Sequence, residues 1–257
     1  MKTLIFQSCQ GTSRAEWLSR CLNSVQMWSK SKGYDYHLSG DEIFHPVPQW
    51  FLSKTPSRMA PATDLGRLLM ARHFLSDGYQ RVVWLDADVF VFDSENFNLT
   101  VDDGYAFGRE VWVQPNDKGG VKAYRNVHNA LSIYVSGNSF LEFYIDSCLK
   151  IMSGVEIDHF PAQLLGPKFL TALHSLVGFH LVDDVGMTSP LVLRDIAAGG
   201  GAAVDLMRRK LTGPMNAANL CSSLIGTTSD GVNLSEDLVK QCLTLLSASK
   251  GSVLSPL

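Results

Sequence analysis

The chain has 257 residues, 46% of them hydrophobic and 18% charged, so it can bury the core of one large α/β domain and is not a disordered polymer. Its formal net charge of −3 argues against broad nucleic-acid binding, which requires a strongly basic surface. No apolar run is long enough to span a bilayer or to form a secretion signal, and the sequence therefore predicts a soluble, cytoplasmic protein.

The five cysteines are odd in number and widely spaced, and none forms a Cys-x-x-Cys pair. This spacing indicates neither a zinc ribbon nor a disulfide framework. It favours free thiols in a reducing compartment.

The first part of the chain alternates between strand-like and helix-like patterns. Residues 3–6 form a short apolar run typical of a buried strand, and residues 17–28 place apolar side chains at helical spacing. Residues 34–38 alternate like a second strand. This order of strand, helix and strand predicts the start of a doubly wound sheet.

A segment rich in proline and aromatic residues, 44–61, predicts an irregular loop near the site. We expect Thr63 or Asp64 to cap the helix that follows. Residues 81–85 then form an apolar strand that runs into Asp86-Ala87-Asp88, and the chain continues extended over 89–92.

The later elements give weaker patterns. Residues 105–113 and 130–135 are predicted strands, and residues 141–152 and 160–177 are predicted helices, the second interrupted by Gly166-Pro167. Residues 197–203 are small and flexible, and Ser235 is predicted to cap a last helix. There is no internal repeat or clear linker, which favours a single domain over residues 1–257.

Asp86 and Asp88 stand one residue apart at the end of an apolar strand. In an extended segment both carboxylates project to the same face, where they repel by about 1 kcal/mol or more when poorly solvated. A divalent cation removes that cost and prefers oxygen ligands of this kind. In open α/β sheets, ligands bind beyond the carboxyl ends of the strands, so the pair is suited to a metal–diphosphate site.

Three segments carry a resemblance to a known family. Residues 81–89, RVVWLDADV, resemble the Asp-x-Asp motif of GT-A glycosyltransferases, above all the retaining galactosyltransferase and glycogenin-like enzymes and the α-mannosyltransferase-like group. Residues 63–69, TDLGRLL, are similar to the Asp-x-x-Arg helix of these families, and residues 166–171, GPKFLT, to their Gly-Pro-x-x-Leu-Thr segment. The order and spacing agree over roughly residues 1–180.

The resemblance implies an α/β GT-A fold, with a Rossmann-like mixed sheet flanked by helices, in which residues 1–104 bind the nucleotide-sugar and residues 105–257 shape the acceptor site. It implies a hexosyltransferase that uses Mn²⁺ or Mg²⁺, a UDP- or GDP-sugar donor, and a polysaccharide, lipopolysaccharide or other glycoconjugate as acceptor, with retention of configuration. Peripheral membrane contact is compatible with such acceptors.

The resemblance also implies roles for individual residues. Asp88 ligates the metal, and Asp86 ligates it or holds the ribose; Asp64 and Arg67 contact the donor sugar and diphosphate; Gln7 and Ser8 line the base; Asp158 and Gln163 face the reacting sugar. GT-A enzymes usually add a late metal ligand, often a histidine. The usual motif around it is absent here, and His180 is the candidate, followed by His159.

Each of these residues also has a structural interpretation. Asp64 can be a helix cap, Arg67 a surface arginine, and His180 a histidine satisfied within the core. Two other functions remain open. The run LDAD resembles the nucleophile motif of haloacid-dehalogenase-like phosphohydrolases, although Phe90 replaces their glycine and the motif lies far from the N-terminus. A non-catalytic sugar-binding module on the same fold is the other.

Overall fold

The computed structural model describes residues 1–257 except 12, 13, 102 and 158. Among these residues, six strands form a main sheet in the order β2-β1-β3-β6-β5-β7. Strands β1, β2 and β3 are mutually parallel, β6 runs antiparallel to both β3 and β5, and β7 is parallel to β5. The strands are β1 (Thr3–Ser8), β2 (Asp35–Ser39), β3 (Arg81–Leu85), β5 (Tyr105–Pro115), β6 (Val121–Val135) and β7 (Leu181–Val182). The α/β fold class with a mixed sheet flanked by helices is confirmed.

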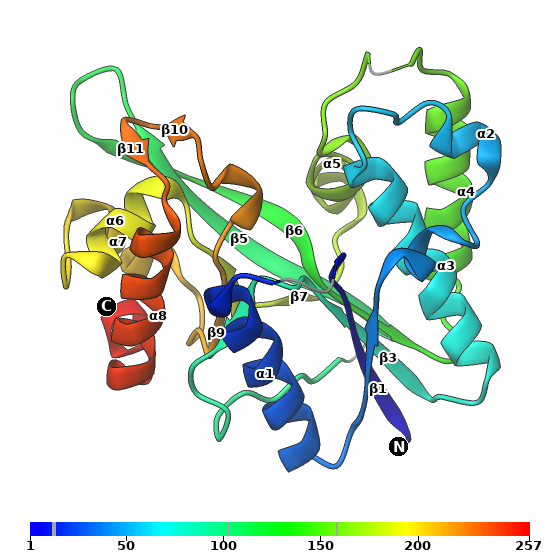
Figure 1. Ribbon diagram of the computed structural model, residues 1–257, viewed down its shortest axis with the longest axis horizontal. Helices are drawn as coiled ribbons and strands as arrows, with labels where there is room; N and C mark the ends of the chain where they lie inside the picture. Colours follow the sequence, from blue (N-terminus) through cyan, green and yellow to red (C-terminus); the bar gives the residue numbers. More distant parts are fainter. Residues whose placement is uncertain (12–13, 102, 158) are drawn as a thin grey trace.

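Helices cover both faces of this sheet because alternate strand residues enter different cores. Phe6 and Trp84 pack in one core with α3 (Ala60–Ser76) and α4 (Phe140–Ser153). Ile5 and Leu85 pack in another core with α1 (Glu16–Ser31). Figure 1 shows α1 on one side of the sheet and α3 and α4 on the other.

A smaller sheet adjoins the carboxyl end of β3. Its order is β4-β9-β8, and it consists of β4 (Val89–Val91), β9 (Ala217–Asn219) and β8 (Val185–Met187). It packs on α6 (Pro190–Ala197), α7 (Ala202–Lys210) and α8 (Glu236–Ser249) through a third core. The remaining elements are η1 (Asp41–Phe44), α2 (Gln49–Leu52), η2 (Leu164–Lys168), α5 (Phe169–Val177), η3 (Ser222–Leu224), β10 (Thr228–Ser229), β11 (Val232–Asn233) and η4 (Ser252–Leu254).

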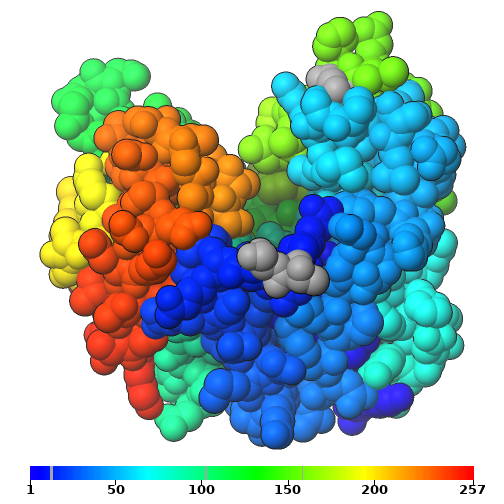
Figure 2. All heavy atoms as spheres, viewed as in Figure 1, coloured from blue at the N-terminus to red at the C-terminus, as the bar shows by residue number. Residues whose placement is uncertain are grey.

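The molecule is hollowed between two groups of elements. Figure 2 shows this hollow between the C-terminal segment that contains β10 and β11 (orange) and the part formed by α2, α3 and α5 (cyan to light green). Strands β5 and β6 cross its floor. The carboxyl end of β3 therefore lies where the two groups meet.

Most predicted elements are confirmed, with two differences in the segment that leads into α3. The predicted loop over 44–61 contains the short helix α2. Helix α3 begins at Ala60, so the prediction that Thr63 or Asp64 caps it is wrong; Pro61 at its first turn favours the earlier start. Ser235 does cap α8, because its hydroxyl accepts a hydrogen bond from the Leu238 amide at 3.2 Å.

Candidate functional site

Asp86, Ala87 and Asp88 form the turn between β3 and β4, at the edge where the parallel strands β1 and β3 end. The Asp86 amide donates to the carbonyl oxygen of Ala130 at 2.9 Å, which continues the pairing of β3 with β6. The Asp86 carbonyl accepts from the Val89 amide at 3.1 Å and from Gln7 Nε2 at 3.0 Å. The backbone of the turn is thus fixed from both sides, and the two carboxylates project from a rigid support.

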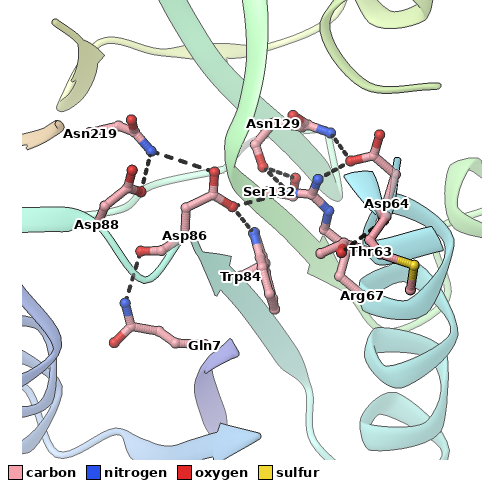
Figure 3. A network of polar contacts seen from close by, with 11 residues as sticks. Gln7, Thr63, Asp64, Arg67, Trp84, Asp86, Asp88, Asn129, Ser132 and Asn219 are labelled. Carbon is pink, nitrogen blue, oxygen red and sulfur yellow. Dashed lines mark hydrogen bonds and ion pairs between the residues drawn. The ribbon is translucent and has the colours of Figure 1, made fainter. Parts of the chain in front are cut away.

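Asn219 joins the two carboxylates. Its Nδ2 donates to Asp88 Oδ1 at 2.7 Å and lies 3.5 Å from Asp86 Oδ2 (Figure 3). The pairing of β4 with β9 places Val89 opposite Asn219, which brings this amide to the site from 131 residues away. The Ser222 amide donates to Asp88 Oδ2 at 2.7 Å. One oxygen from each aspartate therefore points toward the same nitrogen atom.

The other oxygen of Asp86 is held by side chains of β3 and α3. Asp86 Oδ1 accepts from Trp84 Nε1 at 2.6 Å and from Arg67 Nη1 at 3.2 Å. The guanidinium of Arg67 also lies over the Trp84 ring, 5.2 Å from its centroid. These contacts leave Asp86 Oδ2 as the less engaged oxygen of this carboxylate, and its side chain is 33% exposed.

Asp64 and Arg67 form a buried ion pair on α3. Asn129 completes it: its Nδ2 donates to Asp64 Oδ1 at 2.9 Å, and its carbonyl accepts from Arg67 Nη1 at 2.7 Å. Helix α3 packs closely against η1 because Gly66 has no side chain at their contact. A β-carbon at Gly66 would stand only 2.5 Å from the Ile43 carbonyl oxygen. Asp64 and Arg67 are therefore neither cap nor surface residues. They belong to the site network.

Gly166 has a measurable role in this network. A β-carbon there would stand 2.4 Å from Asn129 Nδ2, so Gly166→Ala must displace the amide that holds Asp64. We expect the free energy of unfolding to fall by about 1–3 kcal/mol, as in other overpacked sites. Urea unfolding measures this loss. The double variant Gly166→Ala/Asn129→Ala should lose less stability than the sum of the two single losses, because Asn129→Ala removes the amide that clashes. Strictly additive losses would contradict the contact between Gly166 and Asn129.

Gln7 is fully buried and uses both ends of its side-chain amide. Its Nε2 donates to the Asp86 carbonyl, and its Oε1 accepts from the Tyr36 hydroxyl at 3.0 Å. Tyr36 in turn borders a cavity of about 380 Å³ between α1 and β2. Its lining residues are Arg14, Ser19, Leu22, Asn23, Gln26, Tyr36 and Leu38. Gln7 thus connects the aspartate turn to this cavity.

The described side chains of the network carry an excess of negative charge. Among its side chains are three carboxylates, Asp64, Asp86 and Asp88, and one cation, Arg67, which pairs with Asp64 and Asp86. Burial raises the pKa of Asp86 to about 6; Arg67 opposes this rise, and the neighbouring Asp88 adds to it. Burial also raises the pKa of Asp88, although hydrogen bonds from Ser222 and Asn219 oppose it. The pair is short of positive charge.

This shortage predicts a pH-dependent effect of Asp86→Asn on stability. Because the pKa of Asp86 is raised from 3.8 to about 6, the folded state binds this proton more tightly than the unfolded state. The resulting contribution to the free energy of unfolding is fully present below pH 4 and is lost as the pH rises through 6. At pH 8 we therefore expect Asp86→Asn to increase the free energy of unfolding by about 1 kcal/mol, less than the shift alone implies because water screens the partly exposed side chain. The gain should vanish at pH 4.

Urea unfolding at both pH values tests this, with Asp117→Asn in the exposed turn between β5 and β6 as control. Equal effects of Asp86→Asn at pH 4 and pH 8 would contradict it.

The structure gives the remaining predicted residues other surroundings, and one of them lies outside the described residues. Ser8 donates to the Gly40 carbonyl at 3.2 Å, at the end of β1. Gln163 is exposed at the start of η2, and His159 is exposed and paired with Glu156 at 2.9 Å. Asp158 lies outside the described residues. His180 stands between α5 and β7, where its carbonyl faces the Phe107 amide at 3.4 Å.

A divalent cation fits the aspartate pair. Asp86 Oδ2 and Asp88 Oδ1 both contact Asn219 Nδ2, and carboxylate oxygens are the ligands that hard divalent cations take. Among the described residues, no group of three or more histidine, cysteine or acidic side chains is arranged to hold a metal, and His180 as a further ligand stays a prediction. Mg²⁺ and similar ions commonly bind one or two carboxylates and take their other ligands from substrate phosphates.

Sequence reasoning missed Asn219 and Asn129. Neither stands in a motif, and neutral amides give no charge pattern that marks a site. Each reaches the site through pairing of strands distant in sequence.

No protein-family model and no curated protein matches the chain. Several solved structures match. One is a glycosyltransferase involved in glycosylation of the major capsid of PBCV-1, with 11% identity over 86% of this chain and 96% of that one and a TM-score of 0.48. Two others are the PaToxG glycosyltransferase (14% identity, 68% of this chain and 70% of that one, TM-score 0.43) and the catalytic domain of Drosophila β1,4-galactosyltransferase 7 in complex with xylobiose (10% identity, 66% of this chain and 69% of that one, TM-score 0.29). All three of these proteins are glycosyltransferases. With TM-scores below 0.5, they leave the function to the geometry of the site.

Proposed function

We propose that this chain is a metal-dependent glycosyltransferase that moves a sugar from a nucleotide-sugar to an acceptor hydroxyl. The observation that supports it is the convergence of Asp86 Oδ2 and Asp88 Oδ1 on one nitrogen atom, in a network with three carboxylates and one arginine. A divalent cation brings this charge to balance, and a diphosphate completes its coordination. The pair lies beyond the carboxyl end of a strand, where open α/β sheets bind ligands.

The residues of the site have separate tasks in this proposal. Asp86 and Asp88 hold the cation, and Asn219 and the Ser222 amide orient Asp88. Trp84 fixes the oxygen of Asp86 that faces away from the cation. The cation supplies electrostatic stabilisation of the charge that develops on the diphosphate as the glycosidic bond breaks.

The nucleoside lies on the α1 side in this proposal. The cavity between α1 and β2 has polar side chains and adjoins Tyr36, which Gln7 links to the aspartate turn. Gln7 is buried and hydrogen-bonded at both ends of its side-chain amide, so it acts by holding Tyr36 and the Asp86 carbonyl in place. Tyr36 and the polar residues of α1 offer the surface for a base and ribose.

The resemblance in sequence adds three points to the proposal. The donor is a UDP- or GDP-hexose, the acceptor is a glycan or glycoconjugate, and the configuration is retained. Proton NMR of the product of the first minutes of reaction distinguishes the two anomers. An inverted product would remove retention and leave the metal site of the proposal intact.

Titration calorimetry tests the proposal directly. We expect UDP or GDP to bind in the presence of Mn²⁺ and to bind at least about tenfold more weakly after chelation by EDTA, since the diphosphate then meets uncompensated carboxylates. Failure of both nucleotides to bind with Mn²⁺ would overturn the proposal. Metal-dependent turnover of p-nitrophenyl phosphate, with no such nucleotide binding, would favour the phosphohydrolase instead.

A further inference from the structure

The hairpin of β5 and β6 has two faces with different surroundings beyond the end of β3. Its register places Glu110 opposite Asn126 and Trp112 opposite Tyr124. Opposed residues in an antiparallel pair share a face, as do residues two apart along a strand. These four side chains therefore lie on one face, and a hydrogen bond of 2.7 Å from Asn126 Nδ2 to Glu110 Oε2 joins the first pair.

The opposite face of the hairpin is covered by the C-terminal helices. Val111 and Val113 are buried in the core that contains residues of α6 and α7. Arg125, opposite Val111, donates to the Lys210 carbonyl at the end of α7 at 2.8 Å. The face that carries Glu110 is thus the one turned away from α7.

Glu110 is one of three carboxylates that act on Cys221, near the aspartate site. Burial raises the pKa of the Cys221 thiol. Three nearby carboxylates raise this pKa further: Asp88, Glu110 and Asp86. Cys221 follows β9 directly, and its amide donates to Asn219 Oδ1 at 2.8 Å. Glu110 and the aspartate pair therefore stand around the same short segment, and β5 and β6 cross the floor of the hollow (Figure 2).

The composition of this face is unusual for a solvated hairpin. Glu110 is only 8% exposed, which is rare for a carboxylate that, like this one, pairs with no cation among the described residues. Beyond it stand two aromatic side chains, of which Tyr124 is 45% exposed. Trp112 and Tyr124 belong to none of the buried cores of the described residues. A buried carboxylate, an amide and two aromatic rings thus follow one another outward from the site.

We propose that this face is the acceptor platform, on which a sugar ring lies against Trp112 and Tyr124. Glu110 accepts hydrogen bonds from the sugar hydroxyl groups, and Asn126 donates hydrogen bonds to them. Aromatic rings bind the apolar face of a sugar, and a few placed polar groups fix its orientation. The platform begins beside the proposed metal site, so an acceptor hydroxyl held by Glu110 stands toward the donor. This inference rests on the proposed function and names the substrate class of the same site.

Saturation-transfer-difference NMR tests the platform in the full chain with Mn²⁺ and UDP or GDP present. The probes are p-nitrophenyl α- and β-glycosides of glucose, galactose, mannose, xylose and N-acetylglucosamine. The variants are Glu110→Gln, which keeps the size of the side chain, and Tyr124→Ala. Phe143→Ala on α4 is the matched control, because Phe143 is 48% exposed and lies outside the hairpin. Thermal unfolding verifies that each variant is folded.

We expect at least one glycoside to bind the unsubstituted protein and to bind about tenfold or more weakly to both variants, while Phe143→Ala leaves its affinity unchanged. Nucleotide binding with Mn²⁺ should change less than about twofold in all three variants. Unchanged glycoside affinity in the hairpin variants, or no glycoside bound by the unsubstituted protein while the nucleotide binds, would overturn the platform and leave the proposed donor site standing. Absence of nucleotide binding would remove both proposals.

Discussion

Replacing Asp88 with asparagine is expected to weaken Mn²⁺-dependent binding of UDP or GDP by about 100-fold or more, which corresponds to ~3 kcal/mol. Asp88 is buried, and both of its oxygens are oriented by donors, Asn219 Nδ2 on one side and the Ser222 amide on the other. An asparagine supplies one acceptor oxygen and turns an NH₂ group toward the second donor. The substitution therefore removes a charged ligand and rotates what remains.

The same substitution should leave the chain folded. Removing a buried negative charge beside Asp86 stabilises the folded state, and this offsets the lost hydrogen bond. Asp183→Asn is the control, because Asp183 also accepts from two donors, Arg109 Nε at 2.9 Å and the Thr212 hydroxyl at 2.8 Å, but lies between β7 and β8. Calorimetry gives the affinities. Nucleotide binding by Asp88→Asn at the level of this control would contradict the assignment of Asp88 as a ligand.

The strands that position the site were predictable because burial leaves a direct mark on them. The predicted strand 81–85 agrees with β3, which is buried along its whole length and therefore apolar in sequence. The first half of β6 was missed. It is partly exposed and polar, and only its last residues show the apolar run that predicts a strand. The hairpin with β5 is consequently longer than predicted.

Half of the site follows from charged residues in local motifs, and the rest depends on distant pairing. Asp86, Asp88, Asp64 and Arg67 stand in recognisable segments and do meet in one network. Asn219 comes from a strand of three small residues that has no periodicity to recognise. The third ligand, His180, stays a prediction from its position late in the chain, because sequence spacing alone cannot specify which side chains converge in space.

Arg67 offers the second large expected effect. Its guanidinium donates to Asp64, to Asp86 at 3.2 Å and to the Asn129 carbonyl at 2.7 Å, all in a buried setting. Arg67→Met keeps much of the volume but leaves the Asp64 carboxylate buried without a cation. We expect the free energy of unfolding to fall by about 3–5 kcal/mol, the usual cost of removing one partner of a buried ion pair. Urea unfolding measures it, and an unchanged midpoint would contradict the buried pair.

Combining Arg67→Met with Asp64→Asn separates structure from binding. The double variant removes both buried charges, while Asn129 can still donate to the new amide oxygen, so more than half of the lost stability should return. The network keeps its net charge, because one carboxylate and one arginine leave together.

If Arg67 acts only within the protein, as its engaged guanidinium indicates, this double variant should bind UDP or GDP with Mn²⁺ within about threefold of the unsubstituted chain. A loss of tenfold or more in a stably folded double variant would show instead that Arg67 contacts the diphosphate, since a charge-assisted bond to phosphate is then missing.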